Sequence, residues 1–502
     1  MDKSEIKKEY SKLYNKVQEK DLSEGQFFEW LSQNERKFRS NEYYANSING
    51  FISDIGFDIN SEKVLKCAIS RMNETYIESN KSNFDMGNTY LRLGQLKIQS
   101  HDSFNILIDS DCFRKGAKAL LKVSADDKDY FLRSRTNYAN VLKTYGRIYE
   151  ALLIYDEILE VDPNFGIALV NQATGWLSYI KLYPSEHKPT LLLKKAHENL
   201  NRSLDDPRLV SIAGEGILTF VQENIKYIEN YLSVRELKAI KAKNPPFLMS
   251  KYQRFCITNN LYLNFDLGYY YDKDSLRDSF FPHAIESLEE SLQSPGMSKK
   301  TYYTFQIFNQ ILEDFSTARL IYFESSDISL RNYDNNVNFI YALDYSRNSH
   351  RYGKIKASFT LLSNCLDKIA HLIRFYFKSI ESSQDLYFNW LTSTEFKTIL
   401  KQEKKKQLLA LHSLALDFQR NEIFHSFKSI RNRLTHSFVK VTVLRNPMNE
   451  EEISNDDLKI KWLDLCQRVK AALYYSILAI EPNREETTLN LPLYATFQHG
   501  IY

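Results

Sequence analysis

Apolar residues recur at three- and four-residue intervals along almost the whole chain, and residues that end helices are scarce. The 502-residue sequence contains only 15 glycines and 11 prolines. Intervals of three and four residues place side chains on one face of an α-helix, and a shortage of glycine and proline leaves few points where a helix must stop. The sequence therefore predicts an all-α protein. Because a chain of this length exceeds what one compact core usually holds, we expect two or three cooperative units.

Charge and cysteine content exclude several classes of protein. Lysine and arginine number 66 and aspartate and glutamate 63, a formal net charge of +3, so the chain as a whole does not attract nucleic acid or membranes and any basic site must be local. The five cysteines are scattered without C-x-x-C spacing, which predicts neither a disulfide framework nor a zinc site. The amino-terminal MDKSEIKKEYSK lacks the apolar core of a secretory signal, and no apolar run is long enough to cross a bilayer. We expect a cytoplasmic protein that has no membrane partner.

Residues 81–244 contain pairs of predicted helices that share a pattern. The clearest pair, RTNYANVLKTYGRIYEALLIYDEILEVDP, has a large and then a small residue at Tyr138 and Ala139. Gly146 falls at its turn, and Pro163 follows its second helix. Small residues let two helices approach, a large residue fills the adjoining space, and proline stops the second helix. The pattern resembles the tetratricopeptide repeat.

An upstream copy of this pattern begins at NFDMGNTYLRLGQ, and an insertion displaces its partner helix to about residues 112–122. A looser copy lies downstream. Generic helical hairpins are the alternative interpretation, because any amphipathic helix pair imitates part of the repeat. In both cases these residues pack helices together, and we assign them no chemistry.

The composition changes on both sides of the repeats. Residues 1–80 are predicted to be a helical entry segment without a motif. The sequence NPP ends the repeat region and opens an aromatic-rich helical connector over residues 245–343. Its aromatic side chains either pack in an interface or offer a surface on which nucleic-acid bases stack, and packing is the commoner use. A helical bundle is predicted for residues 344–490, followed by a short tail, residues 491–502.

Four predicted helices make up the bundle. The first, KASFTLLSNCLDKIAHLIRFYF, and the second, KKKQLLALHSLALDF, repeat apolar residues at helical intervals. The third is NEIFHSFKSIRNRLTHSF. The fourth, DDLKIKWLDLCQRVKAALYYSILAI, opens beside Asn455 and Asp456, either of which suits the capping position. Four such helices in succession predict a compact bundle.

The third helix carries the strongest functional signal, the sequence RNRLTH at residues 431–436. This sequence resembles the R-x4-6-H signature of HEPN domains, including the polar residue that often follows the arginine. The first helix, with LDKIAHLIRFYF, is similar to the opening helix of HEPN domains that follow tetratricopeptide-like regions in bacteria. The similarity extends back through YSRNSHRYGKIKASFTLLSNCLDKIA. The resemblance implies a HEPN-type bundle whose catalytic residues are Arg431, Asn432 and His436.

The same spacing occurs once more, a few positions upstream, at Arg420, Asn421 and His425. We favour the later copy because it lies within one continuous apolar stripe. That stripe consists of Ile423, Phe427, Ile430, Leu434 and Phe438. The earlier copy crosses the predicted start of the helix, where Asn421 suits a capping position. It is retained as the alternative motif.

The residue types of the favoured motif suit RNA cleavage without a metal ion or cofactor. The 2′-hydroxyl of RNA can attack the neighbouring phosphate, so catalysis requires a base, an acid and a cation near the developing charge. His436 can act as base or acid at physiological pH. Arg431 offers a planar cation to phosphate oxygens. Asn432, four residues before His436, shares a helix face with it and could position a phosphate oxygen or the imidazole ring.

The spacing of the motif also bears on the oligomeric state. Arg431 and His436 are separated by about 140° around a helix axis, so the two side chains of one chain do not obviously converge. The resemblance implies a symmetric dimer in which two facing motifs form one cleft. The alternative is that both are surface residues near the end of a core helix.

Other charged residues near the motif have weaker claims. Asp367, on the first helix, could orient Arg431 or His436, although an ordinary surface carboxylate is the commoner case. Positively charged residues could contact RNA phosphates through nonspecific electrostatics, although a solvated charge run is the alternative. These candidates are Arg433, Lys404, Lys405 and Lys406. The sequence contains no metal-ligand spacing, glycine-rich phosphate loop or nucleophile elbow.

These features predict an endoribonuclease that cleaves RNA to a 2′,3′-cyclic phosphate and a 5′-hydroxyl. We expect a homodimer through the carboxy-terminal bundle, and a protein or peptide partner on the helical repeats that regulates the nuclease. The family context indicates a role in prokaryotic antiviral defence or growth arrest. The alternative, from a different class, is a catalytically inactive scaffold whose repeats and bundle bind protein partners.

Overall fold

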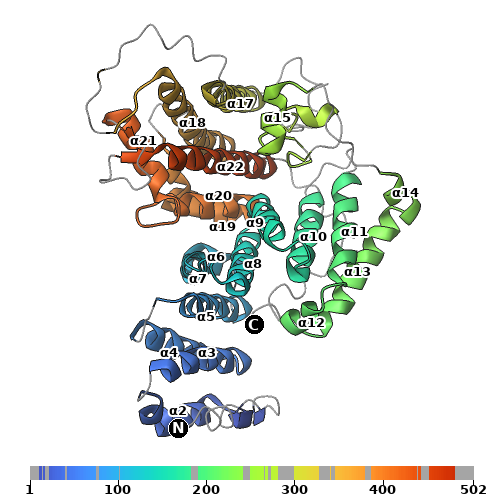
Figure 1. The fold of residues 1–502 in the computed structure, drawn as a ribbon, viewed down its shortest axis with the longest axis vertical. Helices are drawn as coiled ribbons and strands as arrows, with labels where there is room; N and C mark the ends of the chain where they lie inside the picture. The colour runs from blue at the N-terminus through green and yellow to red at the C-terminus, as the bar shows by residue number, and fades with distance from the viewer. Residues whose placement is uncertain are drawn as a thin grey trace.

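Helices account for nearly all of the regular structure, as the apolar periodicity predicts (Figure 1). The computed structural model describes residues 11–13, 15–16, 22–39, 42–74, 78–100, 102–181, 190–240, 249–264, 266–269, 273–280, 299–326, 340, 345–378, 386–437, 439–442 and 452–480. Within them the strands are β1 (Lys440–Thr442) and β2 (Glu452–Ser454), which pair in parallel. The prediction of an all-α fold is confirmed. The NPP break and the predicted tail lie outside the described residues.

The amino-terminal half is a series of helices in which successive elements pack on one another (Figure 1). They are α2 (Glu24–Arg39), α3 (Glu42–Asp58), α4 (Glu62–Glu74), α5 (Asn80–Ser100), α6 (Ser103–Asp109), α7 (Cys112–Leu121), α8 (Lys128–Thr144), α9 (Ile148–Val161), α10 (Gly166–Ile180), α11 (Thr190–Ser203), α12 (Arg208–Ala213), α13 (Gly216–Tyr231) and α14 (Val234–Ala239). This arrangement is consistent with helical repeats.

The α8–α9 hairpin shows how the repeat-like residues pack. Tyr138, Ala139, Ala151 and Tyr155 are all buried between helices. In the upstream copy, α5 packs against α7, and the short helix α6 forms the predicted insertion between them. The helical hairpins are therefore present, and their assignment to the tetratricopeptide family stays a prediction.

The connector contains α15 (Lys251–Thr258) and the short 3-10 helix η1 (Lys273–Leu276). Several of its described aromatic residues pack in the interior, which was the favoured interpretation, whereas Tyr302 is exposed. Tyr262 is buried, and Phe255 stacks on Tyr322 with ring centroids 5.9 Å apart. Tyr322 in turn lies parallel to Trp462 at 3.5 Å. The connector thereby joins the core of the carboxy-terminal helices.

The carboxy-terminal helices form a bundle above the repeats in Figure 1. They are α17 (Lys299–Ser326), α18 (His350–Lys378), the 3-10 helix η3 (Phe388–Thr392), α19 (Thr394–Glu403), α20 (Lys406–Asp417), α21 (His425–His436) and α22 (Asn455–Ile480). Helix α18 packs against α17 on one side and α22 on another, and α20 also packs against α22. One continuous apolar core runs from Phe84 in α5 to Ile480 in α22.

Two predictions of capping residues are wrong. Helix α21 begins at His425, and Asn421 instead occupies a left-handed position in the preceding turn, with φ 65°. Helix α22 is capped by Ser454, whose Oγ accepts a hydrogen bond from the Asp457 N–H at 3.0 Å. A capping side chain must have the right backbone geometry as well as the right chemistry, and local composition does not specify that geometry.

The turn of the α8–α9 hairpin touches the bundle directly through its backbone. Gly146 has φ 79°, and a Cβ atom at this position would lie 2.7 Å from the carbonyl oxygen of Lys406. Only glycine fits both constraints without strain, because the left-handed conformation disfavours L side chains and a backbone oxygen has little freedom to move.

Replacing Gly146 with alanine should therefore destabilise the full chain by about 2 kcal/mol. The measurement is the shift of the urea unfolding midpoint. Gly216→Ala is the matched control, because nothing lies within 4 Å of a Cβ atom there. Equal midpoints for the two variants would show that the Gly146 contact is not required.

Candidate functional site

The motif-bearing helix α21 is oriented by its apolar face. Phe424, Phe427 and Ile430 are buried, and the Phe427 ring lies 6.3 Å from that of Phe359 on α18. Burial of this stripe places α21 against α18. The residues that follow Ile430 then lie where α21 leaves the core.

Arg431 is held between α18 and the segment that enters η3. Its Nη2 atom lies 2.6 Å from Oδ2 of Asp367, and its Cζ atom lies 5.5 Å from the centroid of the Tyr387 ring. The side chain of Arg431 is 25% exposed and Tyr387 is 49% exposed. The Arg431 side chain is thus oriented by the protein and is partly exposed.

Asp367 links three elements around this arginine. Its Oδ1 accepts a hydrogen bond from the Phe388 N–H at 2.8 Å, and its Oδ2 faces Arg431. Burial raises the pKa of Asp367, while the Phe388 N–H and the positive charges of Arg431, His371 and Lys428 act in the opposite direction. The carboxylate therefore lies near the positively charged groups of Arg431 and Lys428. Its contact with Arg431 agrees with the orienting role considered from sequence, and a role in chemistry stays a prediction.

The rest of the favoured motif occupies the last turn of α21. Asn432 is exposed, and Arg433 is half-buried with its Nε donating to the carbonyl of Ser429 at 3.4 Å. His436 is the final residue of the helix. The side chain of His436 and the stripe residue Phe438 lie outside the described residues.

The alternative motif is divided by the start of α21. Arg420 and Asn421 are exposed in the turn before the helix, whereas His425 is its first residue. The Nδ1 atom of His425 is buried and has no hydrogen-bond partner within the described part of the chain. This copy does not lie on one helix, and which of the two copies is functional stays a prediction.

The lysine run proposed to contact RNA lies at the junction with the repeats. Lys404 Nζ is 3.6 Å from Asp102 beside α6, and Lys405 Nζ donates to the carbonyl of Ala479 on α22 at 2.8 Å. Lys406 supplies the backbone that meets Gly146. Nearby, Lys401 of α19 pairs with Asp109 of α6 at 2.9 Å. The contacts described for these lysines are thus with α6, α8–α9 and α22, and Lys405 also lies 5.9 Å from the centroid of the Phe377 ring on α18.

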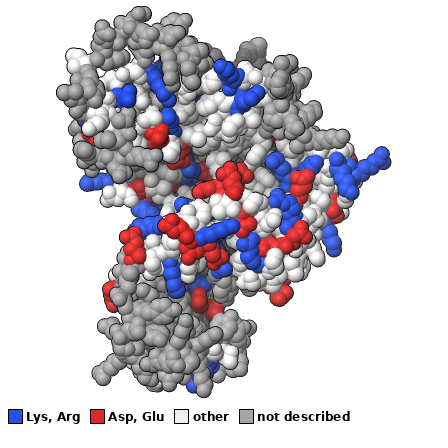
Figure 2. Space-filling model, in the orientation of Figure 1, with Lys and Arg blue, Asp and Glu red and all other residues white. Residues whose placement is uncertain are grey.

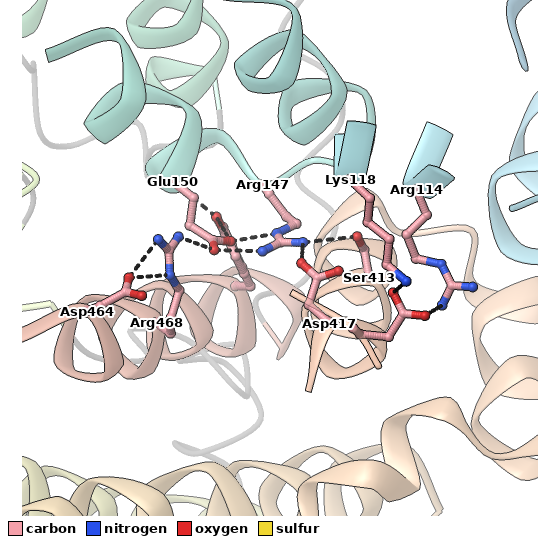
Figure 3. A network of polar contacts seen from close by, with 10 residues as sticks. Arg114, Lys118, Arg147, Glu150, Ser413, Asp417, Asp464 and Arg468 are labelled. Atoms are coloured by element: carbon pink, nitrogen blue, oxygen red, sulfur yellow. Dashed lines mark hydrogen bonds and ion pairs between the residues drawn. The ribbon is translucent and has the colours of Figure 1, made fainter. Parts of the chain in front are cut away.

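A buried charge network at the same junction was missed from the sequence (Figure 3). Arg147, which precedes α9, donates to both carboxylate oxygens of Glu150 at 2.7 Å and to Asp417 of α20 at 2.5 Å. Arg468 of α22 also donates to Glu150 at 2.7 Å. The side chains of Arg147, Glu150 and Asp417 are at most 3% exposed. Burial alone would raise the pKa of Glu150, but the two arginines outweigh it and hold the pKa at about 2.

The only sequence signal for this network is a pair of charges in an apolar hairpin. Arg147 and Glu150 lie three residues apart at the start of a helix, where a local ion pair is unremarkable. Their partners come from helices far along the chain, and one sequence does not reveal that pairing. The network is therefore a finding of the structure.

Among the described residues, no group of three or more His, Cys, Asp or Glu side chains is arranged to hold a metal ion. Within the same part of the chain, no helix combines the length and apolar character needed to cross a membrane. On the face shown in Figure 2, acidic and basic side chains are interspersed. This distribution fits the expectation that any basic site is local.

A helical bundle with an Arg-x4-His sequence on its third predicted helix has the architecture of a HEPN domain. Residues 296–483 match the family model described as LA2681-like HEPN. The carboxy-terminal part of the chain thus carries a HEPN domain, which confirms the resemblance. The match begins before α17, a helix that the sequence prediction placed in the connector. No curated protein and no solved structure matches the chain.

The geometry around Asp367 predicts a measurable contribution to stability. Asp367→Ala should lower the free energy of unfolding by about 2 kcal/mol, because it removes hydrogen bonds to the Phe388 N–H and to a half-buried arginine. Asp314→Ala is the control. It removes a carboxylate of α17 that pairs with Lys368 of α18, and it should lower the free energy of unfolding by less than about 1 kcal/mol. Urea unfolding of both variants measures the difference. Similar losses would show that Asp367 is an ordinary surface carboxylate.

Proposed function

We propose that this protein is a metal-independent endoribonuclease that cleaves RNA to a 2′,3′-cyclic phosphate and a 5′-hydroxyl. The observation that carries the proposal is the position of Arg431. It lies in the Arg-x4-His sequence, within the residues that match the HEPN family model, and its side chain pairs with Asp367 and is 25% exposed. HEPN domains are generally nucleases, and an oriented arginine at the surface is suited to a phosphodiester.

In the proposed mechanism each residue of the motif has one task. Arg431 binds the non-bridging oxygens of the scissile phosphate and stabilises the charge that develops on them. His436 removes the proton from the 2′-hydroxyl or delivers one to the departing 5′-oxygen. Asn432, exposed on the same helix, positions a phosphate oxygen or the imidazole ring. Asp367 acts through Arg431 and is a positioning residue.

The second candidate function is an inactive interaction scaffold. The Arg431–Asp367 pair joins two helices of the bundle, and a domain that had lost its chemistry would have reason to keep such a contact. Incubating pure protein with RNA in the presence of EDTA separates the candidates. Cleavage that leaves cyclic phosphate ends supports the nuclease, and intact RNA supports the scaffold.

The motif residues can be tested individually. We expect Arg431→Ala and His436→Ala each to abolish RNA cleavage in EDTA, because each removes a group that acts on the reacting phosphate. His425→Ala should keep full activity. Circular dichroism melting checks that each variant is folded. If only His425→Ala were inactive, the alternative motif at Arg420, Asn421 and His425 would be the functional one.

We also propose that the site is completed by a second copy of the chain through the carboxy-terminal bundle. Arg431 and His436 lie on one helix at an angle of about 140°, and a two-fold contact supplies both groups to one cleft. Mixing inactive Arg431→Ala and His436→Ala chains should then restore part of the activity. Analytical ultracentrifugation gives the oligomeric state. A monomer that stays active on dilution, or dimers that never complement, would contradict the composite site.

The repeats are proposed to regulate rather than catalyse. Stacked helices offer an extended surface to a protein or peptide partner, and a free ribonuclease would damage its own cell. Such control fits a role in prokaryotic defence or growth arrest. Such control requires contacts that connect the repeats to α21.

A further inference from the structure

The turn between α20 and α21, residues 418–424, is held at its start by the repeats. Arg147 donates to the carboxylate of Asp417, the last residue of α20, and to the hydroxyl of Ser413 at 3.3 Å. The backbone carbonyl of Asp417 accepts the Phe424 N–H at 2.7 Å, which closes the turn. Arg147 therefore holds Asp417, the residue that precedes the turn and whose carbonyl group closes it.

A second repeat helix holds the middle of the turn. Lys118 of α7 has its Nζ atom 2.7 Å from the carboxylate of Glu422, and it donates to the carbonyl of Asn421 at 3.0 Å. Arg114, one turn earlier on α7, lies 4.0 Å from the same carboxylate. Figure 3 shows both side chains reaching from α7 toward the bundle. These contacts hold the part of the turn where Asn421 has its left-handed conformation.

The end of the turn is held indirectly. The guanidinium of Arg468 lies 4.7 Å from the centroid of the Phe424 ring, and the same arginine donates to Glu150 of α9. Phe424 is the residue immediately before α21, and its side chain makes no capping hydrogen bond. A helix of 12 residues without a side-chain cap has little intrinsic control over where it begins.

We infer that Lys118 and Arg147 of the repeats are positioning residues for the candidate nuclease site, because they hold the turn that determines where α21 begins. This inference rests on the proposed function and names the path by which the repeats act. Helical geometry fixes the positions of Arg431 and His436 relative to the first residue of α21. A shift of the turn therefore moves both residues.

The two contacts come from successive hairpins. Lys118 belongs to the α5–α7 pair and Arg147 to the α8–α9 pair. A partner that changes the angle between these pairs must move one contact relative to the other, and the turn that joins them must follow. Binding on the repeats is in this way coupled to the alignment of Arg431 and His436.

The outer contact provides the test, because Lys118 and Glu422 are partly exposed and the buried network stays intact when they change. We expect Lys118→Glu and Glu422→Lys each to lower kcat for a fixed RNA about tenfold with little change in KM, since α21 is misaligned while RNA contacts remain. The double variant Lys118→Glu/Glu422→Lys should recover part of the loss, because the reversed ion pair forms again while the hydrogen bond from residue 118 to the carbonyl of Asn421 does not. Lys63→Glu, which breaks the exposed pair with Glu24 in the entry segment, should have no effect.

Hydrogen exchange of the full chain makes the test independent of catalysis. Amide exchange in residues 418–436 should rise in both single variants and return toward the native value in the double variant. Unchanged exchange and unchanged kcat in the single variants would overturn the inference, as would failure of the double variant to recover. If the native protein does not cleave RNA, the proposed function fails. The exchange measurement then still decides whether Lys118 positions α21.

Discussion

The pairing of Arg147 with Glu150 and Asp417 is the interaction on which the arrangement of the whole chain depends. Removing charged groups from water costs several kcal/mol for each ion, and the cost is offset only when every charge is paired and hydrogen-bonded. Here the arginine belongs to the repeats, and one of its two carboxylates belongs to the bundle. Separating the two regions would break the pair between Arg147 and Asp417 and expose the apolar core that the two regions share. The repeat-like helical region and the HEPN domain therefore share one continuous core.

The fold could be predicted from sequence wherever the determining contacts are local. The α8–α9 hairpin follows from Tyr138, Ala139 and the glycine at its turn, and the displaced helix α7 was also expected. The caps of α21 and α22 were mispredicted, because several residues of suitable chemistry lie close together and backbone geometry selects among them. The network around Arg147 could not be predicted. Its partner Asp417 lies 270 residues away, and an aspartate at the end of a helix gives no indication of what it meets.

The same distinction applies to the candidate site. The spacing of Arg431 and His436 on one helix is a local property, and the sequence indicates it directly. The orientation of Arg431 depends on Asp367 and Tyr387, which come from other parts of the bundle. The position of Asp367 on the first predicted helix made it a candidate to orient Arg431. Nothing in the sequence marked Tyr387 as a neighbour of that arginine. The run at Lys404 is conspicuous in the sequence, and Lys404 and Lys405 make contacts within the protein, so a role in RNA binding stays a prediction.

Two aspartates at the ends of the short helix α6 give the junction a graded response to ionic strength. Asp102, the N-cap residue of α6, lies 3.6 Å from Lys404. Asp109, the last residue of α6, lies 3.8 Å from Lys397 and 2.9 Å from Lys401, and all these pairs are partly exposed. Salt screens such exposed pairs strongly, while the buried pairs around Arg147 are shielded from it. At high salt concentration the exposed ion pairs of α6 would weaken first, while the buried pairs around Arg147 would remain. The insertion between α5 and α7 thus makes the outer part of this contact sensitive to the ions of the surrounding solution.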